Sequence, residues 1–319
     1  MQAVFAVGGD LVDDTIDRPE PGPRDVLVEV QAVSVNPVDT KIRAGGGARR
    51  ILGFDASGTV IAVGGDVTRF DVGDEVYYAG DIARPGSNAQ LQAVDERIVG
   101  HKPAGLSFAE AAAMPLTTIT AWESLFDHLH ADRETTGSLV VVGAAGGVGS
   151  ILVQLGRALT GLRIIGTASR PESADWVRAM GAHEVVGHRG LAAEAKRLAP
   201  GGVDHLFTSY SAGQIEVYAD ILRPFGHIVA IDDERQDLYP LKSKSITWHW
   251  EFMFARAMHH AVDLERQGRL LDEAAELLDK GVLRHTMTTG IGDFSAAGIG
   301  RAHDLVRSGQ AVGKVVVHR

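Results

Sequence analysis

A glycine-rich loop between an apolar strand and a helix constrains the fold of this chain more than any other feature. Residues 139–143 read LVVVG, residues 150–159 read SILVQLGRAL, and the loop between them fits A-x-G-x-x-G. Such glycines let the backbone approach a pyrophosphate and let the helix pack closely on the strand, while the helix N-terminus offers amide donors. The alternative is a strand–helix turn without a ligand. The predicted phosphate-binding residues are Ala145, Gly146, Gly147, Val148 and Gly149.

The segments after this loop alternate between apolar strands and helices. RIIGTAS (163–169) reads as a strand and ADWVRAMG (174–181) as a helix, and the alternation continues to HIVAID. Unbroken apolar strands in this arrangement are typical of a parallel sheet covered on both faces. The first 110 residues and the C-terminal GKVVVH instead show short strands and turns. The sequence therefore predicts a doubly wound α/β domain, residues 121–261, inserted into an antiparallel β domain formed by residues 1–120 and 262–319.

Composition excludes several kinds of partner and chemistry. The net charge of -10 argues against nucleic acid or an anionic membrane as a general partner. The chain has no cysteine, which excludes disulfides, thiolate zinc sites and cysteine nucleophiles. The uncharged stretch 138–156 has the length of a membrane span, but the phosphate loop explains it better. With no secretory signal visible, we expect a cytoplasmic protein.

The end of the strand that follows the loop determines which dinucleotide binds. An NAD site would place Asp or Glu there to hold the ribose 2′-hydroxyl, whereas this chain has Ser169 and Arg170. A hydroxyl and a guanidinium suit a 2′-phosphate. Glu172 is the only rival acid, and Pro171 restricts how it could turn back. The pattern favours NADP(H), with a solvated surface arginine as the alternative.

Several motifs in a fixed order resemble the medium-chain dehydrogenase/reductase superfamily, and within it the zinc-independent quinone oxidoreductase branch. They are SVNPVDTKIR (34–43), GFDASGTVIAVGGDVTRFDVGDEVYY, AAAMPLTTITAWESL, VVVGAAGGVGS, TASRPES and GKVVV. The stretch SITWHWEFMFAR is similar to a sub-branch often labelled zinc-binding alcohol dehydrogenase. The resemblance implies a Rossmann sheet inserted into a GroES-like antiparallel β-barrel domain.

The same resemblance argues against a catalytic zinc. In zinc-dependent members the metal is held by Cys, His and Cys, and these positions fall on Asn36, on Phe54 and near Leu116. An amide, a phenyl ring and an isobutyl group cannot form a tetrahedral site of nitrogen and sulfur ligands. The four-cysteine structural lobe is also missing between Tyr78 and Leu91. The resemblance thus implies an enzyme that uses NADP(H) and no zinc.

The resemblance further implies hydride transfer from NADPH to a quinone carbonyl or to the β-carbon of an enone. Alcohol oxidation without zinc would need another base at the hydroxyl, and none is evident at the matching positions. Reduction of a conjugated acceptor demands less, because the acceptor is already activated and the cofactor carries most of the chemistry. Two alternatives stay open. One is enoyl-thioester reduction, and the other is an NADPH-binding sensor or structural protein with little turnover. The sequence does not identify the small-molecule substrate.

The opening motif SVNPVDTKIR supplies the candidate catalytic residues. Asn36 occupies the place of a zinc ligand, and Lys41 replaces a tyrosine that relatives have beside the nicotinamide. Lys41 could donate to the substrate oxygen or only contact the cofactor. Asn36 could instead be a helix N-cap, since Pro37 suits the first helical position and Asp39 suits the third. The motif therefore allows both a catalytic and a structural interpretation.

Positions elsewhere in the chain match residues that line the cofactor in relatives. Trp248 and Trp250 also lie in a strand, ITWHW, that predicts a hydrophobic sheet edge. In relatives this edge pairs across a homodimer, and the alternative is ordinary core packing. The further cofactor contacts implied by the resemblance are Thr120, His188, Tyr210, Ile231 and Trp250.

Overall fold

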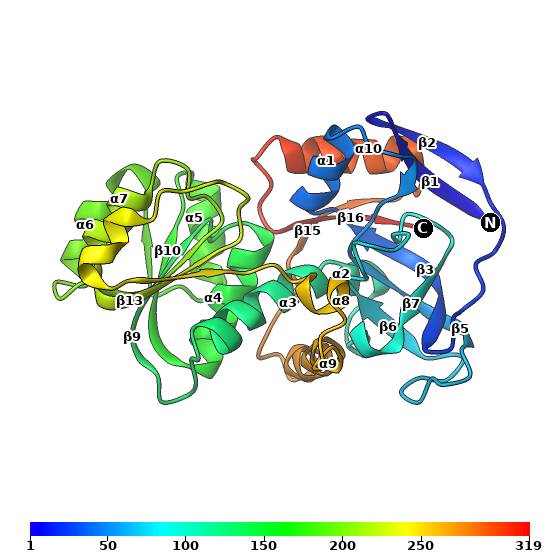
Figure 1. Ribbon diagram of the computed structural model, residues 1–319, viewed down its shortest axis with the longest axis horizontal. Coiled ribbons are helices and arrows are strands. Elements are labelled where there is room, and N and C mark those ends of the chain that lie inside the picture. The colour runs from blue at the N-terminus through cyan, green and yellow to red at the C-terminus, as the bar shows by residue number, and fades with distance from the viewer. The chain divides into compact units, whose positions relative to one another are not determined.

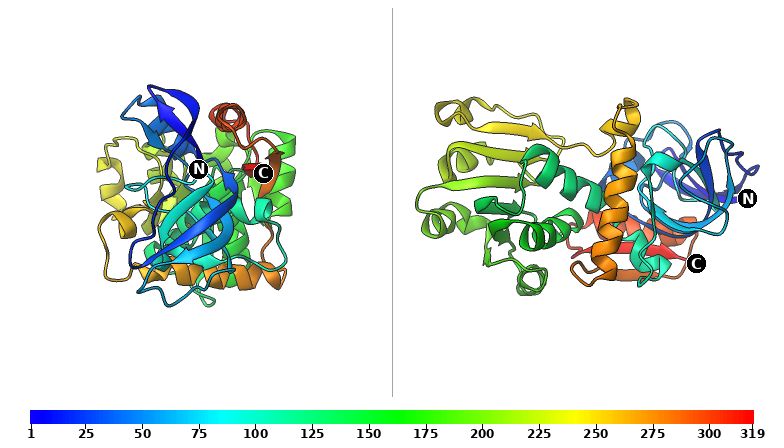
Figure 2. Two further views of the ribbon diagram at one scale, coloured as in Figure 1. Left: turned by 90° about the vertical axis from the view of Figure 1, so that its right-hand side faces the viewer. Right: turned by 90° about the horizontal axis from the view of Figure 1, so that it is seen from below.

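The computed structural model describes residues 1–319, and the chain divides into two compact units (Figures 1 and 2). Unit 1 comprises Met1–Ile119 and Phe254–Arg319, and unit 2 comprises Thr120–Met253. Residues 254–261, which the sequence pattern placed with the dinucleotide domain, therefore belong to unit 1. The reason lies in packing: the ring of Phe254 lies edge-on to that of Phe54 at 5.3 Å, and Ala257 is part of the unit 1 core.

Unit 2 contains the predicted doubly wound sheet. All of its strands are parallel, and their spatial order is β11-β10-β9-β12-β13-β14. Renumbered from the first strand of the unit this order is 3-2-1-4-5-6, which is the Rossmann arrangement. The prediction is confirmed. The strands are β9 (Thr136–Val142), β10 (Gly161–Thr167), β11 (Glu184–Val186), β12 (Val203–Thr208), β13 (Leu222–Ala230) and β14 (Thr247–Trp250).

Helices cover both faces of this sheet, as its apolar strands require. Gly156 of α4 (Gly147–Leu159) contacts Ile164, and Val177 of α5 (Pro171–Ala179) contacts Gly166, so these two helices share one face. The core of the opposite face joins Ile165 to α6 (Leu191–Leu198) and α7 (Ile215–Ile221). The remaining short elements of unit 2 are η3 (His188–Gly190), η4 (Tyr239–Lys244) and the π-helix η2 (Glu123–His128), and α3 (Pro115–Trp122) contains the boundary between the two units.

Unit 1 is built on a seven-stranded sheet that combines both ends of the chain. Its path is β15-β16-β3-β5-β6-β8, with β7 paired to β3, and only β15 and β16 run parallel. A smaller sheet has the order β2-β1-β4. The strands are β1 (Gln2–Val7), β2 (Asp10–Thr15), β3 (Asp25–Ser34), β4 (Arg50–Ile51), β5 (Ala56–Val63), β6 (Glu75–Tyr78), β7 (Leu91–Asp95), β8 (Val99–His101), β15 (Met287–Ile291) and β16 (Lys314–His318).

Helices pack around the sheet of unit 1. The longest, α9, is the orange helix of Figure 2, and it packs against β8. From the neighbouring strand β6, the hydroxyl of Tyr77 donates to the carbonyl of Leu271 on α9 at 2.5 Å. The helices are α1 (Pro37–Ala44), η1 (Glu96–Ile98), α2 (Phe108–Ala112), α8 (Ala255–Met258), α9 (Glu265–Asp279) and α10 (Ala296–Arg307).

The register between β3 and β16 positions the residues that matter below. Val316 stands opposite Ser34 in this antiparallel pair, and the amide of Val35 donates to the carbonyl of Val315 at 3.1 Å. Continued by two residues, the same register brings Lys314 opposite Asn36. The last strand of the chain thus supplies a side chain to the opening motif.

Strand β14 is the outermost strand of the unit 2 sheet, and the side chains of Trp248 and Trp250 meet there edge-on at 5.2 Å. Trp250 is 49% exposed. The homodimer expected from this edge stays a prediction. None of the helices combines the length and the apolar character needed to cross a membrane.

Candidate active site

The glycine-rich loop has the geometry of a phosphate cradle. Gly143 has a φ of +83°, which favours glycine, and Gly146 is the N-cap of α4. A Cβ added to Gly149 would lie 2.4 Å from the carbonyl oxygen of Gly143, so helix and loop can approach this closely only with glycine. The N-terminus of α4 therefore stands at the carboxyl end of β9, where its free amides and dipole can hold a pyrophosphate.

The other predicted cofactor residues of unit 2 follow the carboxyl ends of its strands. A dinucleotide bound to a doubly wound sheet lies across this edge. Ile231 is half-buried and the rest are exposed. In strand order the residues are His188 after β11, Ser169 and Arg170 after β10, Tyr210 after β12, Ile231 after β13 and Trp250 at the end of β14.

The segment that would read the ribose has a fixed backbone and exposed side chains. The amide of Arg170 donates to Ser173 Oγ at 3.2 Å, and Ser173 Oγ donates to the carbonyl of Arg170 at 2.9 Å. Ser169 and Arg170 are exposed at the start of α5. The amide of Gly143 donates to Thr167 Oγ1 at 3.1 Å, which ties the end of β10 to the phosphate loop. The end of β10, which leads into Ser169 and Arg170, is thus bonded to the phosphate loop.

In unit 1, Asn36 belongs to a buried charged network with Asp55 and Lys314. The Asn36 amide group donates to Asp55 Oδ2 at 2.7 Å, and Lys314 Nζ donates to Asn36 Oδ1 at 2.5 Å. Lys314 Nζ also lies 3.0 Å from Asp55 Oδ2 and 3.2 Å from the carbonyl of Val35. Asp55 is fully buried and Lys314 is 4% exposed. A buried ion pair of this kind is tolerated because hydrogen bonds satisfy its remaining donors and acceptors.

The buried carboxylate of Asp39 holds the backbone beside this network. Its Oδ2 accepts from the amide of Asn36 at 2.8 Å and its Oδ1 from the amide of Gly53 at 3.0 Å. Burial raises the pKa of the Asp39 carboxyl to about 7. Asp39 thus ties the start of α1 to the segment that leads into β5.

Asp55 is buried like Asp39, and it also has the cationic side chain of Lys314 as a neighbour. Burial raises its pKa, and the positive charge of Lys314 opposes that shift. The amide of Leu116 donates to Asp55 Oδ1 at 2.7 Å. Both carboxylate oxygens of Asp55 therefore have donors. The network is complete within unit 1.

The three positions aligned with zinc ligands do come together, but they do not fit zinc. Asn36 and the amide of Leu116 bond to Asp55, and the buried ring of Phe54 precedes it in the chain. The Asn36 oxygen already accepts from an ammonium group, and neither a phenyl ring nor an isobutyl group has a donor atom for zinc. The ammonium group of Lys314 also neutralises the carboxylate of Asp55, the charged oxygen donor beside the Asn36 side chain, and its positive charge opposes binding of a cation there.

Lys41 and Thr120, two further predicted site residues, differ in their burial. Lys41 is exposed on the last turn of α1, whereas Asn36 at the start of the same helix is buried. Thr120 is buried on α3. The amide group of Asn36 is held by Asp55 and Lys314, and the Asp39 carboxylate binds the Asn36 backbone amide. The structural role predicted for Asp39 is therefore visible in its hydrogen bonds.

Sequence reasoning did not identify Asp55 or Lys314. Signals for both were present: GFDASG puts a carboxylate inside an apolar segment, and Lys314 opens the apolar strand KVVVH. Charged residues are almost never fully buried unless they are paired. A lysine and an aspartate that both lie in apolar segments are therefore candidates for partners, although the sequence does not say which residues pair.

Residues 22–123 match the family model of the alcohol dehydrogenase GroES-like domain, and residues 180–317 match that of the zinc-binding dehydrogenase domain. A zinc-type alcohol dehydrogenase-like protein of Staphylococcus aureus is 41% identical over 311 residues, which cover 94% of this chain and 92% of the relative. The chain is a medium-chain dehydrogenase/reductase. As a member of this superfamily it is an oxidoreductase.

Three further proteins are similar to this medium-chain dehydrogenase/reductase. The 2-methylene-furan-3-one reductase of Solanum lycopersicum is 30% identical over 307 residues, covering 92% of this chain and 71% of the relative. An alcohol dehydrogenase superfamily protein from Novosphingobium aromaticivorans, solved as a crystal structure, has a TM-score of 0.90 at 31% identity, covering 100% of this chain and 99% of that chain. The Escherichia coli quinone oxidoreductase, with a TM-score of 0.85 at 23% identity over the full length of both chains, shares the fold.

Proposed function

We propose that this medium-chain dehydrogenase/reductase is a zinc-independent, NADPH-dependent reductase of quinones or α,β-unsaturated carbonyl compounds. The observation that carries the proposal is the buried Asn36–Asp55–Lys314 network: Asn36 stands at a position aligned with a zinc ligand, and its side chain is engaged by Asp55 and Lys314. Alcohol oxidation without zinc needs another base at the hydroxyl. A conjugated acceptor is already activated and needs only stabilisation of the negative charge that develops on its oxygen.

The proposed cofactor site is the carboxyl edge of the unit 2 sheet. The N-terminus of α4 would hold the pyrophosphate, and Ser169 and Arg170 would bind the 2′-phosphate that distinguishes NADPH from NADH. When bound, NADPH supplies the hydride. The exposed rings of Tyr210 and Trp250 at the same edge would shield the cofactor from water.

The proposed catalytic group is the ammonium of Lys41. An exposed lysine on α1 can turn toward a substrate oxygen and donate to it as negative charge develops there. Asn36 contributes differently, because its amide is engaged by Asp55 and Lys314. We propose that Asn36 positions α1, the helix that carries Lys41. Thr120 is proposed as a contact for the nicotinamide.

The activity of one relative supports the choice of acceptor. The protein of Solanum lycopersicum is named for the reduction of 2-methylene-furan-3-one, whose exocyclic double bond is conjugated to a carbonyl. That is one of the two acceptor classes proposed here. An NADPH-binding sensor with little turnover is the second candidate function.

The decisive experiment measures NADPH consumption with quinones, enones and an enoyl thioester side by side, with and without a strong chelator. Turnover of a quinone or an enone that is unchanged by the chelator is the expected result. Oxidation of simple alcohols with NADP⁺ that disappears after chelation would overturn the proposal. Tight NADPH binding without turnover of any acceptor would favour the sensor.

Two variants separate catalysis from positioning. Lys41→Ala should lower turnover more than tenfold while the affinity for NADPH changes little, and Asn36→Ala should lower both turnover and stability. Lys280→Ala, at a lysine of α9 that is exposed and paired with Glu276, is the matched control. A loss of tenfold or less in both test variants would leave positioning of the reactants as the whole mechanism.

A further inference from the structure

One cavity of the protein lies entirely within unit 1. It has a volume of about 550 Å³ and is bounded by β1, β4, β7 and the loop 83–86. Its volume lies within the range of pockets that bind small molecules. None of the residues proposed above for catalysis or cofactor binding lines it.

The walls of this cavity are mostly apolar, with cations among them. Nine of the lining positions carry Met, Phe, Ile, Leu, Pro or Ala side chains, which would favour an apolar ligand body. The charged lining residues are three arginines and one glutamate: Arg49, Arg50, Arg84 and Glu20. The charged lining is thus predominantly positive, although the protein as a whole has a net charge of -10.

Two of the arginines already have carboxylate partners. Arg84 binds Asp25 with both of its terminal nitrogens, at 2.8 and 2.7 Å. Arg49 pairs with Asp14, and its guanidinium lies 3.7 Å from the centre of the Phe5 ring. Neither arginine needs a ligand to balance its charge.

Arg50 differs because its guanidinium makes no ion pair. It is half-buried, donates to the carbonyl of Ile82 at 2.6 Å, and lies 5.9 Å from the centre of the Phe54 ring. A half-buried guanidinium without a carboxylate gains most from an anion, because it presents several donors in one plane. Among the three arginines, Arg50 is therefore the one whose charge a bound anion would balance.

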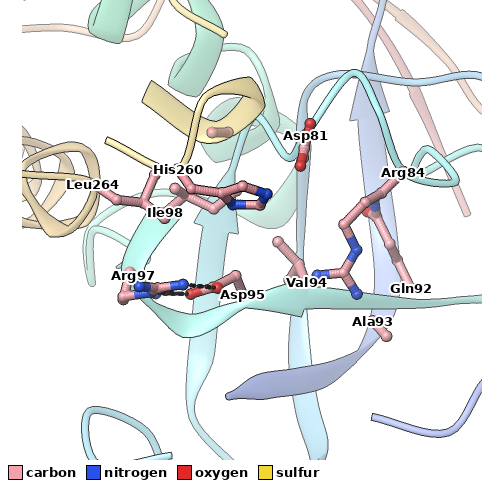
Figure 3. Close-up of a pocket in the computed structure, with 11 residues that line it drawn as sticks. Asp81, Arg84, Gln92, Ala93, Val94, Asp95, Arg97, Ile98, His260 and Leu264 are labelled. Atoms are coloured by element: carbon pink, nitrogen blue, oxygen red, sulfur yellow. Dashed lines mark hydrogen bonds and ion pairs between the residues drawn. The ribbon is translucent and has the colours of Figure 1, made fainter. Parts of the chain in front are cut away.

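Gln92 provides an acceptor in the same wall. It is 5% exposed, and its Nε2 donates to the carbonyl of Pro85 at 3.0 Å, while no protein donor reaches its Oε1. Leaving such a buried acceptor unsatisfied destabilises the protein, so a ligand that donates to it gains affinity. Gln92 and Arg84 also line a smaller cavity of about 100 Å³, whose lining includes His260 and Leu264 (Figure 3).

We propose that the larger cavity binds a small amphipathic carboxylate, with its carboxyl group at Arg50 and a hydroxyl or amine on its apolar body that donates to Gln92. The apolar walls exclude water from the ligand body, Arg50 gains a counter-ion, and Gln92 Oε1 gains a donor. The site is independent of the proposed reductase activity.

Calorimetric titration of the NADPH-saturated protein first tests whether the cavity prefers a negatively charged ligand. The probes are decanoate, decanol and decylamine, which share one apolar chain. Decanoate should bind at least tenfold more tightly than either of the others. Arg50→Gln should weaken decanoate binding at least tenfold. The control is Arg301→Gln, at an exposed arginine of α10 that pairs with Asp293 outside the cavity, and it should stay within twofold.

The proposed hydrogen bond from the ligand to Gln92 is tested with decanoates that carry one hydroxyl, at carbon 2, 3 or 10. At least one should bind more tightly than decanoate, and Gln92→Leu should abolish that advantage while decanoate itself binds as before. Equal binding of decanoate and decylamine, or an Arg50→Gln protein that binds decanoate like wild type, would overturn the proposal. If no hydroxylated probe gains affinity, the assignment of Gln92 is wrong.

Discussion

The buried network of unit 1 and the carboxyl edge of the unit 2 sheet both concentrate polar side chains, but in opposite states. Asn36, Asp55 and Lys314 are buried and satisfy one another. Ser169 and Arg170 are exposed beside the free amides of a helix N-terminus. A closed network of this kind stabilises a fold, because its members already have partners. An open edge can bind a ligand, because its donors are accessible.

This difference predicts which property each region controls. Changes in the closed network should affect stability, and changes at the open edge should affect cofactor affinity. The two responses can be measured separately, because all four tryptophans (122, 176, 248 and 250) lie in unit 2. Tryptophan fluorescence therefore follows unit 2, while circular dichroism follows both units.

The largest effect is expected for Lys314→Met. Removing the cation leaves Asp55 buried without its counter-charge, which should lower the free energy of unfolding by about 3–5 kcal/mol. Urea titration followed by circular dichroism measures it, with Lys280→Met as an exposed control. The double variant Lys314→Met/Asp55→Leu should recover part of the loss. A loss below about 1 kcal/mol in the single variant would show that the network does not stabilise unit 1.

The second prediction concerns Arg170→Ala. Loss of the guanidinium should weaken NADPH binding about 30- to 100-fold, corresponding to about 2–2.7 kcal/mol, and leave NADH binding unchanged. Fluorescence titration with both cofactors measures this. Arg178→Ala on the same helix, whose arginine pairs with Asp175, is the control. If neither cofactor binds more weakly to Arg170→Ala, this arginine does not read the 2′-phosphate.

The third prediction concerns His205, a buried residue that should lower the stability of the fold at acidic pH. His205 is buried in unit 2 beside His227, its Nδ1 has no hydrogen-bond partner, and burial lowers its pKa to about 4. The unfolded chain, with a histidine pKa near 6.5, takes up the proton first as the pH falls. Stability should therefore decrease from pH 6.5 toward pH 4, with no further contribution below.

Over the full range from pH 6.5 to pH 4 this contribution is about 3 kcal/mol. Urea titrations followed by tryptophan fluorescence at several pH values should show a shallower pH dependence for His205→Leu than for wild type. The exposed His259 provides the control variant, His259→Leu. Identical pH dependences for His205→Leu and wild type would argue that His205 titrates normally in the folded protein.

The smallest effect is expected for Ser169→Ala. Loss of one hydroxyl donor to the 2′-phosphate should weaken NADPH binding about three- to tenfold, with stability and NADH affinity unchanged. The same fluorescence titration measures it. An equal loss for NADH would place the hydroxyl elsewhere on the cofactor.

The phosphate loop could be predicted from sequence because its geometry is local. Gly143 needs a positive φ, and Gly149 must lie against the carbonyl of Gly143 six residues earlier in the chain, so spacing alone carries the information. The opening motif could be read only in part. Its helix start and the role of Asp39 follow from local capping rules, whereas the partners of the Asn36 side chain lie far away in the chain.

By itself the sequence determined the parallel sheet, its place between two halves of an antiparallel domain, and the position of the phosphate loop, because these follow from periodicity and short-range spacing. The tertiary structure decided which side chains surround Asn36. Lys314 meets Asn36 and Asp55 from 278 and 259 residues away, through the register of β16 on β3. A charge buried this deeply is stable only where folding brings its partner to it, and no local pattern in a single sequence specifies that partner.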